Sequence, residues 1–132
     1  MQIQCTKKLL SEMKVEADER IERDSIFDWH ANVIKLGRRK AVVLVNDISR
    51  YSILIYGVKV ADFHRLSERI SLAINQVLQA EGIEKSIIDE YFEAAGKVNF
   101  THTKSRKMVS TMTQRVKELE MIVDDLGDDE RV

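Results

Sequence analysis

The residues best suited to chemistry lie between Phe27 and Tyr56, where polar side chains interrupt strongly apolar runs. Asp28, His30 and Asn32 alternate there, so in a β-strand all three would lie on one face. A histidine between a carboxylate and a carboxamide has the composition of an oriented general base or a metal ligand. The alternative, which we favour, is that His30 and Asn32 form structural hydrogen bonds across the sheet or to a loop.

The sequence offers little to complete a catalytic or metal site. His64 and His102 lack a metal-ligand spacing to His30, and Cys5 is the only cysteine, so we predict no metal site and no disulfide. Cys5 is expected to be a buried strand residue rather than a reactive thiol. The five glycines are isolated, which excludes a glycine-rich phosphate loop. We predict no cofactor and no nucleophile elbow.

Basic side chains occur in clusters that suit a phosphate. The segment THTKSRK, residues 101–107, lies where a strand should become a helix, and helix N-termini attract anions. The alternative is capping, in which Thr103 or Ser105 accepts hydrogen bonds from the first amides of the helix. The full predicted nucleic-acid-binding set is Lys7, Lys8, His30, Asn32, Arg38, Arg39, Lys40, Arg50, Lys104, Arg106 and Lys107.

The net charge of −1 conceals an uneven distribution. Residues 118–132 hold seven acidic residues and one basic residue, so the first 117 residues hold 20 Lys and Arg against 15 Asp and Glu. The body is therefore basic, which is compatible with a polyanionic partner. We interpret residues 124–132 as an acidic C-terminal tail. A second interpretation is that this tail screens the basic face until a nucleic acid displaces it.

The elements that would position these residues can be read from the hydrophobic pattern. Strands are predicted at residues 2–5, from Phe27, at 41–45, at 51–56 and at 98–103. Helices are predicted at residues 7–14, 62–82, 84–95 and from residue 104 or 105 to 123. The charged segment VEADERIERD, residues 15–24, is predicted to be a mobile connector.

This order predicts one α+β domain over residues 1–123. We expect a mainly antiparallel sheet with a central three-stranded meander, packed by about four helices. No apolar run is long enough to span a membrane and the N-terminus lacks the apolar region of a secretory signal, so we expect a cytoplasmic protein. The apolar stripe of the last helix is the predicted homodimer interface.

Five segments together resemble a family of small uncharacterised bacterial domains: CTKKLL, FDWHAN, GRRKAVVLVND, RYSILIYG and FTHTKSRK. The same segments are similar to the N-terminal part of plasmid-borne Orf-type proteins of mobile elements. In the family that these segments resemble, the last segment commonly ends with a Met-Asn pair, whereas this chain has Met112 followed by Thr113. The resemblance implies no established activity. Its recurring polar positions correspond to Lys7, Lys8, Asp28, His30, Asn32, Arg38, Arg39, Lys40, Asn46, Thr101, Thr103 and Arg106.

Three functions follow as hypotheses. The first is a non-enzymatic binding domain of a bacterial mobile-element or stress locus, with RNA or DNA as the ligand. The second is a protein-interaction or regulatory module that uses the last helix. The third is a small metal-independent ribonuclease with His30 as its base and Arg38, Arg39 and Arg50 as its phosphate clamp.

Overall fold

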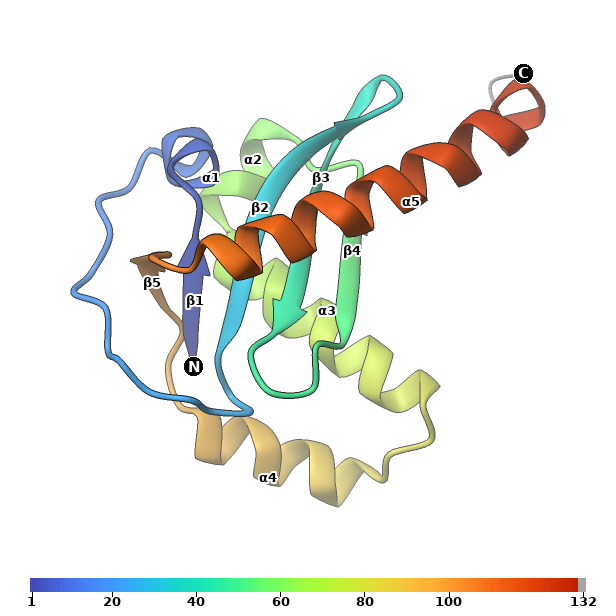
Figure 1. The fold of residues 1–132 in the computed structure, drawn as a ribbon. Coiled ribbons are helices and arrows are strands. Elements are labelled where there is room, and N and C mark those ends of the chain that lie inside the picture. The colour runs from blue at the N-terminus through green and yellow to red at the C-terminus, as the bar shows by residue number, and fades with distance from the viewer. Residues whose placement is uncertain (131–132) are drawn as a thin grey trace.

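A five-stranded mixed sheet with helices on both faces forms the centre of the protein (Figure 1). The computed structural model describes residues 1–130, with side chains up to residue 122. The strands are β1 (Gln2–Cys5), β2 (Trp29–Leu36), β3 (Arg39–Asn46), β4 (Ser52–Tyr56) and β5 (Asn99–His102). The helices in this range are α1 (Lys7–Met13), α2 (Val60–His64), α3 (Leu66–Ala80), α4 (Lys85–Ala95) and α5 (Arg106–Glu130).

The predicted α+β class is confirmed, but the sheet is mixed rather than mainly antiparallel. The strand order is β4-β3-β2-β1-β5. The predicted three-stranded meander forms β2, β3 and β4, but it is not central: it makes up one side of the sheet and ends in the edge strand β4, whereas β1 pairs in parallel with both β2 and β5. Parallel neighbours need long crossover connections. The chain provides them: α1 and a long connector join β1 to β2, and the whole segment from α1 to α4, including β2, β3 and β4, lies between β1 and β5.

One predicted helix is divided in two. The helix expected from Asp62 to Gly82 is interrupted at Arg65, whose φ of −123° and ψ of 30° are not helical. As a result the described residues hold five helices rather than about four. Gly82 follows α3 with a φ of +82°, a conformation that glycine adopts without steric cost. The hydrophobic stripe was continuous across Arg65, so periodicity alone did not mark the break.

Two apolar cores lie on opposite faces of the sheet. Trp29, Ala31 and Val33 alternate along β2 and belong to the core beneath α1, α2 and α3. The intervening positions Ile34 and Leu36 belong to the second core, beneath α5. Figure 1 shows α5 crossing in front of β2, β3 and β4 and then continuing beyond the sheet. Within the described residues no helix is long and apolar enough to cross a membrane.

The connector between α1 and β2 is bonded to the sheet. The Asp18 amide donates to the Phe100 carbonyl (2.8 Å), and the Ile21 amide donates to Oε1 of Gln2 (3.0 Å). The Arg20 guanidinium donates to Oε1 of Gln4 (2.9 Å). Glutamines on β1, an inner strand between β2 and β5, therefore supply the partners that an apolar face would not. The prediction of a mobile connector rested on the lack of an apolar face in residues 15–24. It missed these contacts because the connector bonds to a polar part of the sheet.

Candidate nucleic-acid interface

An open crevice lies at the edge of the sheet where β1 and β5 end. The two strands are parallel, with Cys5 opposite His102, so their carboxyl ends share one edge. Each strand is followed by a helix start: Thr6 caps α1, and α5 begins at Arg106. The space between them has a volume of about 710 Å³. Crevices outside the carboxyl ends of strands are common ligand sites in sheets with parallel strands.

Three cations from the predicted set line this crevice. They are Lys7 from α1 and Lys104 and Arg106 from the segment that enters α5. Among the residues that the structure describes, no ion pair involves any of the three. Lys8 and Lys107 are exposed neighbours of these residues in the chain. The crevice therefore has positive charge that is not neutralised by nearby carboxylates, which favours an anionic ligand.

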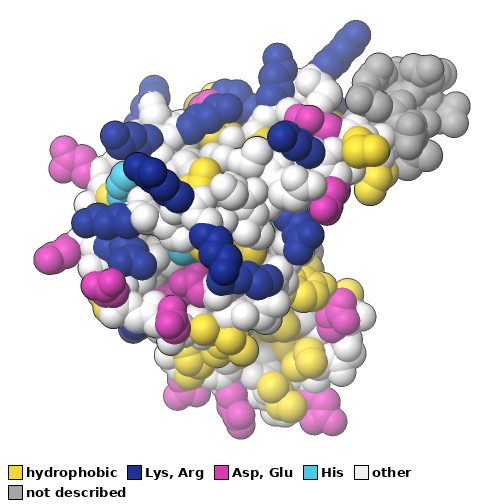
Figure 2. Space-filling model, viewed as in Figure 1, with side chains coloured by type: hydrophobic (Ala, Val, Ile, Leu, Met, Phe, Trp, Pro, Cys, Tyr) yellow, Lys and Arg dark blue, Asp and Glu magenta, His cyan; other side chains and the backbone are white. Residues whose placement is uncertain are grey.

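The wider surface agrees with this polarity. Figure 2 shows Lys and Arg side chains gathered on the upper part of this face, over α1 and along α5, while Asp and Glu side chains stand among the basic ones at its left margin. Hydrophobic and acidic side chains gather in the lower part, toward α4. The upper part of this face is thus richer in basic side chains than the lower part.

The hydroxyl groups of the crevice satisfy the backbone. Oγ1 of Thr103 accepts from the Ser105 amide (3.2 Å), and Oγ of Ser105 accepts from the Met108 amide (3.1 Å). Of the two predicted capping residues, Ser105 caps α5, whereas the bond of Thr103 is to Ser105, which precedes the helix. Both oxygens act as acceptors in these bonds, so each hydroxyl still has its O–H to donate and can add to the anion contacts of the lysines and Arg106.

The comparisons with known proteins agree with the predicted family type. The family model of a domain of unknown function, DUF6933, matches residues 2–132. The chain belongs to this family. Neither the curated proteins nor the solved structures gave a match. The expected membership of an uncharacterised domain family is confirmed, while the resemblance to plasmid-borne mobile-element proteins stays a prediction.

In this DUF6933 chain the histidine of the predicted strand is buried. Nδ1 of His30 lies 2.7 Å from Oδ1 of Asp47, so it donates to that carboxylate. Nε2 is buried and has no hydrogen-bond partner among the described residues. His30 faces away from the Trp29 core, as predicted, but α5 and the connector lie on that side. Neither ring nitrogen is therefore exposed at the crevice.

The two neighbours of His30 on the same face also have separate partners. Oδ1 of Asn32 accepts from the Thr6 hydroxyl (2.6 Å) and from the Val33 amide (2.8 Å). The Asp28 carboxylate is fully buried and binds Arg23. The three polar residues thus stabilise three different contacts. The structural interpretation of His30 and Asn32 fits this arrangement, in which they do not form one catalytic group.

The remaining predicted cations do not line the crevice. Arg38 and Arg39 lie at the hairpin between β2 and β3, and Lys40 pairs with Glu12 of α1. Arg50 adopts a left-handed φ of 62°, and its guanidinium contacts the Met108 sulfur. These residues belong to other parts of the surface, so the predicted clusters do not form a single site.

Cys5 is fully buried on β1. Burial raises the pKa of its thiol to about 12, so the thiol stays protonated at neutral pH and is a poor nucleophile. The prediction of a structural cysteine is confirmed. Among the described residues, no group of three or more His, Cys, Asp or Glu side chains is placed to hold a metal ion.

Six residues that line the crevice are missing from the predicted set: Thr6, His102, Thr103, Ser105, Val109 and Ser110. Ser110 stands four positions after Arg106, so helical spacing alone places both on one face of α5. That signal was available in the sequence.

Thr113 stands where the family that the sequence resembles has an asparagine. Its hydroxyl donates to the Val109 carbonyl (2.9 Å) and so bonds within its own helix.

Proposed function

We propose that this DUF6933 domain is a non-enzymatic nucleic-acid-binding domain that holds the phosphate backbone in the crevice. The observation that carries the proposal is the convergence of Lys7, Lys104 and Arg106 at the ends of two adjacent parallel strands. They come from segments almost 100 residues apart, and none is engaged in an ion pair among the described residues.

The lining of the crevice favours contacts to phosphate over contacts to bases. Its side chains are cationic, hydroxyl-bearing or small, apart from His102, and no Phe, Tyr or Trp lines it within the described residues. Stacking on aromatic side chains is the usual means of holding unpaired bases. Phosphate contacts by Lys and Arg instead give binding that is strong at low salt and largely independent of sequence.

Affinity should fall steeply as salt rises. We expect an oligonucleotide of about 20 nucleotides to bind with a slope of log K against log salt of roughly −2 to −3, since three cations contact phosphates. Fluorescence anisotropy with labelled RNA, single-stranded DNA and duplex DNA between about 20 and 300 mM salt measures this slope. The absence of binding at the lowest salt, or a slope near zero, would refute the proposal.

The burial of His30 gives the ribonuclease hypothesis no accessible base, so the proposal is for binding without catalysis. The location of the gene in a mobile-element or stress locus, and a cytoplasmic location of the protein, are further proposals. They rest on the resemblance and on the composition of the chain alone.

A second candidate function is protein interaction through α5. The helix continues beyond the sheet (Figure 1), and the side chains of Met121 and Ile122 there are 68% and 53% exposed. These exposed apolar side chains are the observation that favours a partner on this part of α5. The predicted homodimer would use this part of α5. The side chains of the predicted acidic tail, residues 124–132, lie outside the part of the chain whose side chains the structure describes.

Sedimentation equilibrium tests this dimer. We expect a dimer for the natural chain and a monomer for the Met121→Glu/Ile122→Glu variant, since two carboxylates cannot be buried without partners. The matched control is Val60→Glu/Leu72→Glu, which places the same charges at exposed apolar positions of α2 and α3. A monomeric natural chain at 100 μM would reject the homodimer.

A further inference from the structure

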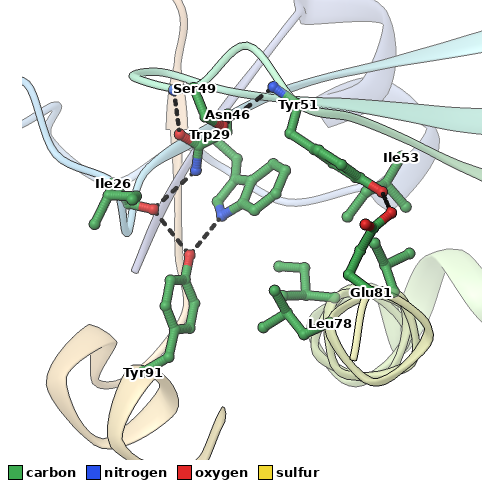
Figure 3. A pocket seen from close by; sticks show the side chains of 11 residues that line it. Ile26, Trp29, Asn46, Ser49, Tyr51, Ile53, Leu78, Glu81 and Tyr91 are labelled. Atoms are coloured by element: carbon green, nitrogen blue, oxygen red, sulfur yellow. Dashed lines mark hydrogen bonds between the residues drawn. The ribbon is translucent and has the colours of Figure 1, made fainter. Parts of the chain in front are cut away.

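A second hollow, separate from the crevice, lies between the sheet and the helices α3 and α4. Its volume is about 210 Å³. Figure 3 shows Trp29 and Tyr91 on one side of it and Ile53 and Leu78 on the other. Side chains that are distant in the sequence thus form one pocket, whose walls come from β2, β4, α3 and α4.

Asn46 organises the rim of this pocket. The residue is buried, and its backbone amide donates to the Tyr51 carbonyl (2.9 Å). Its Nδ2 donates to the Ile26 carbonyl (2.8 Å), and its Oδ1 accepts from the amides of Ile48 and Ser49 (both 3.0 Å). One side chain therefore joins the end of the connector to the turn between β3 and β4, and this fixes the shape of the opening.

The polar atoms inside the pocket are already paired. Nε1 of Trp29 donates to the Tyr91 hydroxyl (3.2 Å), which in turn donates to the Ile26 carbonyl (2.9 Å). The walls consequently present apolar and aromatic surface to anything that enters. Water is held poorly in such a space, because it needs two or more polar partners. A ligand with a hydrophobic ring would fit it better.

The volume of the pocket and the charge at its rim restrict the class of ligand further. An apolar cavity of about 150 Å³ is enough to bind benzene, so this pocket is large enough for a ring system of indole size. At the rim, Oε1 of Glu81 accepts from the Tyr51 hydroxyl (2.9 Å). A carboxylate has further lone pairs to offer, and its charge favours a cation or an N–H donor and disfavours an anion.

We propose that this pocket binds a small aromatic amine. The ring lies among Trp29, Tyr91 and the α3 side chains Val77 and Leu78, and the amine lies at the rim against Glu81. Burial of its ring supplies the main driving force. This site is independent of the crevice, so the two proposals fail or hold separately.

Three probes with the same ring test the proposal by isothermal titration calorimetry: tryptamine, indole and indole-3-acetate. Tryptamine is expected to bind at least fivefold more tightly than indole and at least 20-fold more tightly than indole-3-acetate. In the Glu81→Gln variant the three affinities should lie within about threefold of one another. Glu81 is exposed, so this variant tests the charge preference without altering the core.

A second test fills the pocket with a larger side chain. Val77→Phe should abolish tryptamine binding, while Leu72→Phe, an exposed position of the same helix, should leave it unchanged. Circular dichroism verifies that both variants fold. The proposal is overturned if no probe binds at 5 mM, if indole-3-acetate binds as well as tryptamine, or if folded Val77→Phe binds normally. If the chain dimerises and the dimer no longer binds tryptamine, a second copy covers the pocket, and this outcome also overturns the proposal.

Discussion

Replacing Asp28 by asparagine is expected to lower the free energy of unfolding by about 2–3 kcal/mol. The carboxylate is fully buried and accepts from the Gln2 amide (2.9 Å), from Nε2 of Gln2 (3.3 Å) and from two nitrogens of Arg23 (2.7 and 3.0 Å). An asparagine would offer one acceptor to these donors. The loss stays below that of a fully buried ion pair, because the Arg23 side chain is 42% exposed and can return to water.

Urea unfolding followed by the fluorescence of Trp29, the only tryptophan, measures this loss. The matched control is Asp24→Asn, which removes an exposed carboxylate from the same segment and should change stability by less than about 0.5 kcal/mol. Equal stability of Asp28→Asn and the natural chain would show that the buried carboxylate does not hold the connector to β1.

The same carboxylate should make stability depend on pH. Burial by itself raises the pKa of Asp28, but hydrogen bonds from Arg23 and Gln2 outweigh it and the pKa lies below its usual value. The contribution is thus fully present above the unfolded pKa of about 3.9 and is lost as the pH falls through the lower folded value. Between pH 5 and pH 3 the natural chain should lose more stability than Asp28→Asn.

Reversing two charges in the crevice should have the largest effect on binding. The Lys104→Glu/Arg106→Glu variant is expected to lose about 100-fold in affinity for nucleic acid at low salt, and its salt slope should become shallower by about 2. Both side chains line the crevice, and neither forms an ion pair among the described residues. Their replacement should therefore leave the fold intact.

The control for this variant must change the net charge by the same amount. Arg65→Glu/Lys85→Glu does so at the start of α3 and of α4, and should weaken binding by less than about threefold. Equal losses in the two double variants would attribute binding to overall charge rather than to the crevice. Unchanged binding by Lys104→Glu/Arg106→Glu would exclude the crevice as the interface.

Most of the elements follow from local patterns. The strand at residues 2–5, the Thr6 cap and the alternation that places Trp29 and His30 on opposite faces of the sheet were all predictable. These features depend on neighbours within a few positions, where hydrogen-bond geometry and hydrophobic period act directly. The capping of α5 by Ser105 was predictable for the same reason.

The sequence by itself thus determined the α+β class, the meander, most helices and the chemical character of the basic segments. Only the tertiary structure decided that β1 pairs in parallel with β5, and this pairing brings Lys7 beside Lys104 and Arg106. It also buried His30 against Asp47 and placed Trp29 and Tyr91 in one pocket. Strand order and helix packing join residues far apart in the chain, and their energies depend on the burial that the whole fold creates.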